Sequence, residues 1–263
     1  MAWLSVITVV KDDPEGFART CASLREQDAT GIEWVVVDGS ADADEVPELM
    51  GYASDDLTTV YEHREPAGIY PAMNHALSLA SGEYAYFLNS GDRLQDASVL
   101  RRVGEVLAAS PEWAFGPVAI EEVGGGTVIT PPWDYERERA VSFSRGLFAP
   151  HQGTFARTEV LRAFGGFDTS YRVAADYAVF LRLSLVADPV HLPFVIATFS
   201  EGGTSTLKWQ ESFREFHRAR VAILGPTGVA ALRERWETLA HYALVYTHRE
   251  VRPRLSWPKR RTT

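Results

Sequence analysis

Acidic side chains stand at the ends of several apolar runs in this sequence. Asp38 closes the run Trp34–Val37, Asp92 comes shortly after the run Tyr84–Leu88, and Asp176 begins another apolar run. Carboxylates at strand ends hold a diphosphate only through a hard divalent cation, and oxygen ligands select Mg²⁺ or Mn²⁺. The pattern therefore predicts a cation site that binds a diphosphate, with Asp92 as the leading candidate ligand.

The segment around Asp92 has a second interpretation. The run Tyr84–Leu88 predicts a buried strand, and the turn formers Asn89-Ser90-Gly91-Asp92 follow it. Open α/β sheets bind ligands at the carboxyl ends of their strands, which favours a site. A turn in which Asp92 or Asn89 hydrogen-bonds the local backbone explains the same residues. The segment alone leaves both readings open.

Common nucleotide and hydrolase motifs are absent. No G-x-G-x-x-G follows the first strand, and there is no G-x-x-x-x-G-K-[ST] phosphate loop and no G-x-S-x-G. These absences argue against a dehydrogenase, a P-loop enzyme and a serine hydrolase.

The chain begins with the pattern of a parallel α/β fold. Residues 3–10 and 33–38 are β-branched and apolar as in strands covered on both faces, and Pro14 suits the first turn of a helix over 14–27. Strand, helix and strand in this order predict a parallel pair with a right-handed crossover. We further expect strands at 58–61, 84–88, 152–156 and 190–199, a hairpin over 114–129, helices at 44–53, 71–80, 97–109, 158–164, 176–185, 208–224 and 227–248, and loops at 62–70, 130–150 and 201–205.

Composition limits the class of protein. The 263 residues are 46% hydrophobic, which is enough for a full core. The single Cys21 excludes an internal disulfide, and no apolar segment is long enough to cross a bilayer. We expect a cytoplasmic protein. The net charge of −9 argues against nucleic-acid partners.

The C-terminal segment 249–263 is basic, with six basic residues against the one acidic Glu250. With Leu255 and Trp257 it suggests peripheral contact with the inner face of an anionic membrane, and a solvated chain end is the alternative.

Several short motifs occur in a fixed order along residues 3–206. They are Ser5-Val-Ile-Thr-Val-Val10, Asp38-Gly39-Ser40, Gly68-Ile-Tyr-Pro-Ala-Met-Asn74, Gly82-Glu-Tyr, Asn89-Ser-Gly-Asp92, His151-Gln152, Gly165-Gly-Phe-Asp168 and Ala175-Asp176-Tyr177. In their order and spacing they resemble family 2 glycosyltransferases, which have the GT-A fold, and most closely the bacterial branch that builds surface polysaccharides. The resemblance implies a Rossmann-like α/β fold with a mixed sheet flanked by helices, a nucleotide-sugar half (1–110), an acceptor half (111–206) and a C-terminal helical extension (207–263).

The resemblance also implies roles for single residues. Asp92 matches the metal ligand of a DxD-like motif, and Asp176 matches the general base, although an N-cap of the following helix is an ordinary role for Asp there. His151 and Gln152 match positions on the acceptor side. Nucleotide-binding positions are matched by Thr8, Val10, Asp38, Asn74, Asn89 and Gly91.

The resemblance predicts an inverting, metal-dependent transfer of a sugar from a nucleoside diphosphate, uridine or deoxythymidine by preference, to a hydroxyl of a glycan or glycolipid. The chain departs from the family where acids are common, at Gly91, Ala67 and Pro71. Two alternatives are a sugar nucleotidyltransferase, for which Lys11-Asp12-Asp13-Pro14 is a poor phosphate loop, and a non-catalytic nucleotide-binding scaffold.

Overall fold

The computed structural model of the chain describes residues 2–28, 30–42, 44–51, 57–130, 135, 148, 150–200 and 209–247. Most of the predicted loop 130–150, the predicted loop 201–205 and the basic segment 249–263 lie outside these residues.

A parallel sheet forms the first part of the fold, as the sequence predicts. Strand β1 has seven buried residues in a row and pairs in parallel with β2 on one side and β4 on the other. The register places Val10 beside Asp38, so the two strands end together. These strands are β1 (Leu4–Val10), β2 (Ile32–Asp38), β3 (Thr58–His63) and β4 (Tyr84–Phe87).

The same sheet continues into the second part of the chain with mixed directions. Strand β9 runs antiparallel to both β4 and β6, and β10 is parallel to β6. The order across the sheet is β10-β6-β9-β4-β1-β2-β3. The added strands are β6 (Trp113–Phe115), β9 (Thr154–Arg157) and β10 (Val190–His191).

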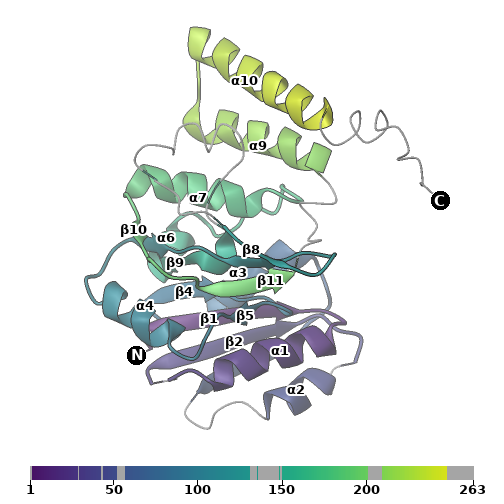
Figure 1. The fold of residues 1–263 in the computed structure, drawn as a ribbon, viewed down its shortest axis with the longest axis vertical. Coiled ribbons are helices and arrows are strands. Elements are labelled where there is room, and N and C mark those ends of the chain that lie inside the picture. The colour runs from purple at the N-terminus through teal and green to yellow at the C-terminus, as the bar shows by residue number, and fades with distance from the viewer. Residues whose placement is uncertain are drawn as a thin grey trace, which may run out of the picture.

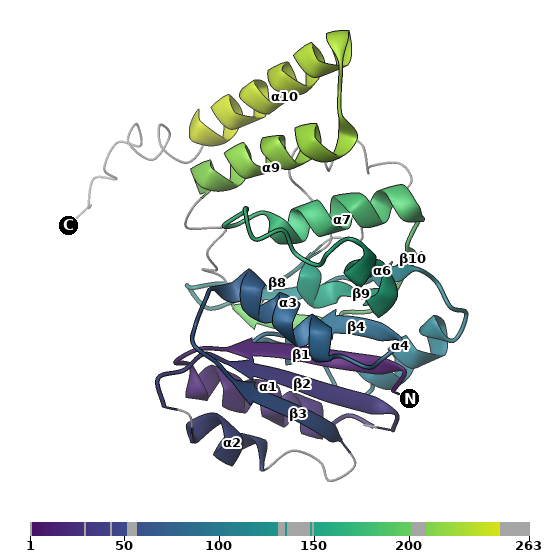
Figure 2. The ribbon, with the colours of Figure 1, turned by 180° about the vertical axis from the view of Figure 1, so that it is seen from behind.

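Helices cover both faces of this sheet (Figures 1 and 2). One apolar cluster joins one face to α1, α2 and α4, and a second joins the other face to α3, α6 and α7. The mixed sheet between two helical layers confirms the predicted α/β class. The helices are α1 (Pro14–Arg25), α2 (Glu45–Met50), α4 (Val99–Leu107), α3 (Ile69–Leu79), α6 (Thr158–Ala163) and α7 (Ala175–Val186).

A second, four-stranded sheet has the order β5-β11-β7-β8. Its β7–β8 pair is the predicted hairpin, but residues 113–115 join the main sheet instead. The single strand expected over 190–199 is wrong: it is divided into β10 and β11 around Pro193, which has no N–H to donate. The strands are β5 (Arg93–Leu94), β7 (Ala119–Glu121), β8 (Thr127–Ile129) and β11 (Ala197–Ser200).

Two long helices, α9 (Trp209–Leu224) and α10 (Gly228–Tyr246), form the predicted C-terminal extension. Figure 1 shows α7, α9 and α10 stacked one outside the other, with α10 farthest from the sheet. Among the helices the structure describes, none is both long enough and apolar enough to cross a membrane.

Candidate active site

A pocket of about 620 Å³ opens where β1 and β2 end. Its floor includes Val10 and Asp38, and one wall is the loop from Arg64 to Ala72. Ser90, just after β4, also lines it, so the pocket extends toward the turn that carries Asp92. The location matches the rule that open α/β sheets bind ligands at the carboxyl ends of their strands.

Asp38 is buried at the end of β2. One carboxylate oxygen accepts from the Ser40 backbone N–H at 2.8 Å and the other from the Tyr61 hydroxyl at 3.0 Å. Burial and the neighbouring Asp38 raise the pKa of Tyr61, so the phenol keeps its proton and donates it. Asp38 and Val10 both line the pocket, and their predicted contact with a nucleoside stays a prediction.

Two basic side chains in the pocket wall were not among the predicted site residues. Lys11 follows β1 directly and Arg64 follows β3 directly, and both line the pocket. Positive charge at this edge suits an anionic ligand. The signal was present in the sequence as a basic residue immediately after each of two parallel strands.

Thr8 is not brought to the pocket. It is fully buried, donates to the Leu88 carbonyl at 2.7 Å and accepts from the Trp34 indole at 2.9 Å. A strand with both faces covered places alternate residues on opposite sides, and Thr8 lies on the side of α1 and Trp34. The Thr8 side chain therefore does not line the pocket, and a nucleotide-binding role for this position stays a prediction.

The side chain of Asn74 is hydrogen-bonded to the backbone of Phe167 and does not reach the pocket. Its amide donates to the Phe167 carbonyl and accepts from the Phe167 N–H, both at 2.7 Å. A Cβ on Gly166 would lie 2.3 Å from the Asn74 oxygen, so glycine is needed for this approach. Asn74 fastens α3 to the loop before α7 and does not line the pocket, and its predicted nucleotide role stays a prediction.

Asp92 lies in a tight, buried turn and is 8% exposed. Burial raises the pKa of its carboxyl to about 6, while the charge of His151 and hydrogen bonds from the Gln152 side chain and the Asn89 backbone lower it. Thr20 fixes the turn by donating to the Asp92 carbonyl at 2.7 Å. The segment is therefore a backbone-bonded turn, and the role of Asp92 as a metal ligand stays a prediction.

His151 stands between the two candidate acids. Its Nδ1 lies 3.8 Å from Asp176 Oδ2, and its Nε2 lies 3.3 Å from Asn89 Nδ2. The side chains of His151 and Asp176 are each 20% exposed, so both reach solvent. Gln152, expected on the acceptor side, instead bonds Asp92 with its side chain and accepts from Tyr86 with its carbonyl. The structure therefore brings Asp92, Asn89, His151 and Asp176 together.

Asp176 is the second residue of α7 and not its N-cap, because Ala174 occupies that position without a side-chain cap. Its Oδ1 accepts from the Tyr177 N–H at 2.7 Å, and Oδ2 faces His151. The backbone just before α7 is held by Glu215 of α9, which sequence reasoning missed. Its carboxylate accepts from the N–H groups of residues 172, 173 and 174 at 2.8–3.1 Å.

Arg182 of α7 donates to the Phe164 carbonyl at 3.0 Å. Burial acts to raise the pKa of Asp168, but hydrogen bonds from Ser170 and the charge of Arg182 hold it below its ordinary value. Arg182 therefore supports the structure around α7.

The residues beside Asp92 fit a divalent cation. Asn89 Oδ1 is buried and has no hydrogen-bond partner among the described residues. Together with the Asp92 carboxylate it offers oxygen donors, the type that Mg²⁺ and Mn²⁺ prefer. Within the described ranges no three His, Cys, Asp or Glu side chains gather into a metal site, so further ligands must come from a bound diphosphate or water.

Gly91 explains why no acid stands in the middle of the turn. Its φ is +90°, a conformation that other residues adopt only with strain. Its N–H donates to the Thr20 hydroxyl at 3.1 Å, and Asp13 Oδ2 lies 3.7 Å from where its Cβ would be. Gly91 shapes the turn, and Asp13 brings a carboxylate to the same side.

Two solved structures that bind nucleotide sugars have a similar fold. Residues 1–349 of TarS from S. aureus, in complex with UDP-GlcNAc, superpose with a TM-score of 0.67 at 17% identity, over 94% of this chain and 73% of that one. The mannosyltransferase PcManGT from Pyrobaculum calidifontis, in complex with GDP-Man and Mn²⁺, gives 0.64 at 19% identity, over 94% and 75%. At this identity the likeness establishes the GT-A fold.

Sequence relatives extend over most of the chain. An uncharacterized glycosyltransferase of Mycobacterium tuberculosis is 31% identical over 84% of this chain and 80% of its own length. A PGL/p-HBAD biosynthesis glycosyltransferase of Mycobacterium bovis is 28% identical over 91% of both chains. The profile described as "Glycosyl transferase family 2" matches residues 5–164. This chain is therefore a glycosyltransferase and belongs to glycosyl transferase family 2.

Proposed function

We propose that this protein is an inverting, divalent-metal-dependent glycosyltransferase that moves one sugar from a nucleoside diphosphate to a hydroxyl of a glycan or glycolipid. The observation that carries the proposal is the meeting of Asp92 and Asp176 around His151, next to the pocket at the ends of β1 and β2. The UDP-GlcNAc and GDP-Man complexes of the two structural neighbours support a nucleotide-sugar donor.

In this proposal the pocket holds the nucleoside against Val10 and Asp38, and Lys11 and Arg64 face the phosphates. Asp92 and Asn89 hold Mn²⁺ or Mg²⁺, which when bound stabilises the charge of the leaving diphosphate. The Mn²⁺ in the mannosyltransferase complex supports a divalent cation.

Asp176 acts as the general base. An acceptor hydroxyl between Asp176 and the donor loses its proton to the carboxylate as its oxygen bonds to the anomeric carbon. The bond from that carbon to the diphosphate breaks on the opposite face, which inverts the configuration. General-base catalysis of this kind contributes about 10²–10⁴-fold to the rate. His151 orients the Asp176 carboxylate through Nδ1, while Nε2 of the same ring faces Asn89.

We also propose that residues 1–206 form the catalytic domain and that the enzyme works in the cytoplasm, with the basic segment 249–263 touching the inner face of the membrane. Six basic residues against one acid support that contact, at about 1 kcal/mol for each basic residue near an anionic surface.

Release of nucleoside diphosphate from a panel of nucleotide sugars, with Mn²⁺, Mg²⁺ or a chelator, tests the proposal. Asp176→Asn should abolish turnover and keep donor binding by calorimetry close to wild type. Asp92→Ala should lose the metal-dependent part of that binding. Normal turnover in either variant overturns the assignment, and turnover that a chelator does not affect overturns the metal dependence.

A further inference from the structure

The outer side of α10 carries an exposed apolar surface that the catalytic site does not use. Val229, Leu232, Trp236 and Leu239 are 82%, 66%, 73% and 63% exposed. Their spacing of three, four and three residues places them on one side of the helix. We name these four residues the α10 stripe. Single exposed apolar residues are ordinary, but a continuous row that includes a tryptophan marks an interaction surface.

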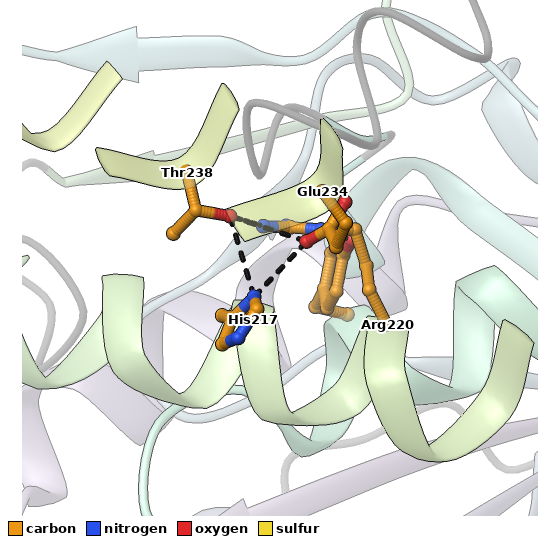
Figure 3. A network of polar contacts seen from close by, with 5 residues as sticks. His217, Arg220, Glu234 and Thr238 are labelled. Carbon is orange, nitrogen blue, oxygen red and sulfur yellow. Dashed lines mark hydrogen bonds and ion pairs between the residues drawn. The ribbon is translucent and has the colours of Figure 1, made fainter. Parts of the chain in front are cut away.

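The opposite side of α10 is fixed to the rest of the fold by polar contacts (Figure 3). Glu234 accepts from Arg220 Nε of α9 at 2.7 Å and lies 3.1 Å from His217 Nδ1. Thr238 accepts from Arg220 Nη2 at 2.8 Å. Arg220, at the centre of this network, is 3% exposed, so its contacts with α10 lie between the two helices. The α10 stripe is therefore held facing away from the sheet.

Arg220 also connects the helix pair α9–α10 to α7, which carries the proposed base Asp176. Arg220 Nη1 donates to the Tyr177 hydroxyl at 3.2 Å, and Tyr177 follows Asp176 in α7. A surface that lies on α10 thus has a fixed orientation relative to the proposed base.

Charge indicates what the α10 stripe meets. Arg233 and Arg235 lie at helical positions on its two borders, with Arg233 paired to Glu237 of the same helix at 2.7 Å. The chain after α10 carries six basic residues between positions 249 and 261 against one acid. Anionic lipid headgroups attract such a set, and Trp is favoured at the boundary between headgroups and acyl chains. An anionic lipid surface is therefore the occupant that matches this charge.

We propose that α10 lies in the plane of an anionic membrane, with the α10 stripe inserted among the acyl chains and the flanking arginines at the headgroups. The proposal goes beyond a contact made by the basic segment 249–263 alone. It assigns membrane docking to the folded helix α10, which fixes the orientation of the candidate active site relative to the membrane. It is independent of the donor and of the reaction at the site.

Co-sedimentation of the full chain with vesicles tests the proposal. Vesicles of phosphatidylcholine alone are compared with vesicles that also contain phosphatidylglycerol. The wild-type protein should pellet with the anionic vesicles, and the double variant Leu232→Glu, Leu239→Glu should bind at least about tenfold more weakly. The matched control is Leu185→Glu on α7, because Leu185 is 61% exposed and is not in the α10 stripe. It should bind within about twofold of wild type.

Three results overturn the proposal. The first is a wild-type protein that stays in solution with anionic vesicles. The second is a double variant that pellets as well as the control, which would leave binding to the basic segment alone. The third is a wild-type dimer in sedimentation velocity that the double variant converts to monomer, which would make the α10 stripe an interface between copies. Melting curves check that the variants fold. Donor hydrolysis without vesicles, measured in parallel, reports on the proposed function separately.

Discussion

His151 Nδ1 lies 3.8 Å from Asp176 Oδ2, although the two residues come from different elements, η1 (His151–Gly153) and α7. On the other side of the imidazole, Nε2 lies 3.3 Å from the Asn89 amide. The contact places one histidine beside both the proposed base and the proposed cation site. Its removal should therefore affect catalysis more than donor binding.

The variant His151→Ala tests this relationship. We expect kcat to fall by about tenfold to a hundredfold while the donor Kd changes little, because the Asp176 carboxylate loses its neighbour and not its charge. Residues that act as a unit are not additive, so adding His151→Ala to Asp176→Asn should cause no further loss of kcat. Independent losses in the double variant would contradict a joint role.

Asp92 gives a pH dependence of stability in the metal-free protein. Its folded pKa of about 6 lies above the ordinary value of 3.8. The folded state therefore holds the proton more tightly than the unfolded state. The associated stability is complete below pH 3.8 and is lost as pH rises through 6, by about 3 kcal/mol in total.

The variant Asp92→Asn has no such titration. Its free energy of unfolding, relative to wild type, should rise between about pH 4 and pH 7 by up to that amount. Urea titrations at several pH values in the presence of a chelator measure the difference. A constant difference across this range would show that the Asp92 pKa is not raised. Added Mn²⁺ should stabilise wild type above pH 6 and leave Asp92→Asn nearly unchanged.

Asn74 should matter for stability and not for donor affinity. Asn74→Ala leaves the N–H and C=O of Phe167 without their partners, and we expect a loss of about 2 kcal/mol. Ser78→Ala, an exposed position on the same helix, is the control and should cost less than about 0.5 kcal/mol. Calorimetric titration of the folded variant with donor decides the question, since a large drop in affinity would restore the nucleotide role predicted from the sequence.

Replacing Gly91 with the acid that is common at this position in the family should destabilise the protein. Gly91→Asp forces a side chain onto a backbone with φ of +90° and places a second carboxylate near Asp13, so we expect a loss of about 1–3 kcal/mol. Gly124→Asp in the β7–β8 turn is the matched control, because a Cβ there meets nothing within 4 Å. Equal melting temperatures for the two variants would show that a side chain at position 91 causes no backbone strain.

The sequence predicted the parts of the fold that local signals define. β-branched runs, helix-starting prolines and turn residues located β1, β2, β4 and the helices between them. The insertion of β9 between β4 and β6 was not predicted, because such pairing depends on contacts between distant parts of the chain. The division of the segment 190–199 into two strands does have a local signal in the sequence, which is Pro193.

The acids singled out in the sequence lie near one another in the structure. Asp38 lines the pocket, and Asp92 and Asp176 lie around His151. The direction of two other side chains could not be predicted. A strand that is buried on both sides gives no clue to which face Thr8 occupies, and a helix pattern does not reveal that Asn74 meets a backbone ninety-three positions away.

Strand β4 lies between β1 and β9, so its two sets of backbone groups are satisfied by segments from both ends of the catalytic region. During synthesis β9 leaves the ribosome long after β4. Until then β4 is an open edge with apolar neighbours, the arrangement that recruits other chains into aggregates. A fragment ending at residue 110 should for this reason express poorly, even though it contains every residue that lines the pocket.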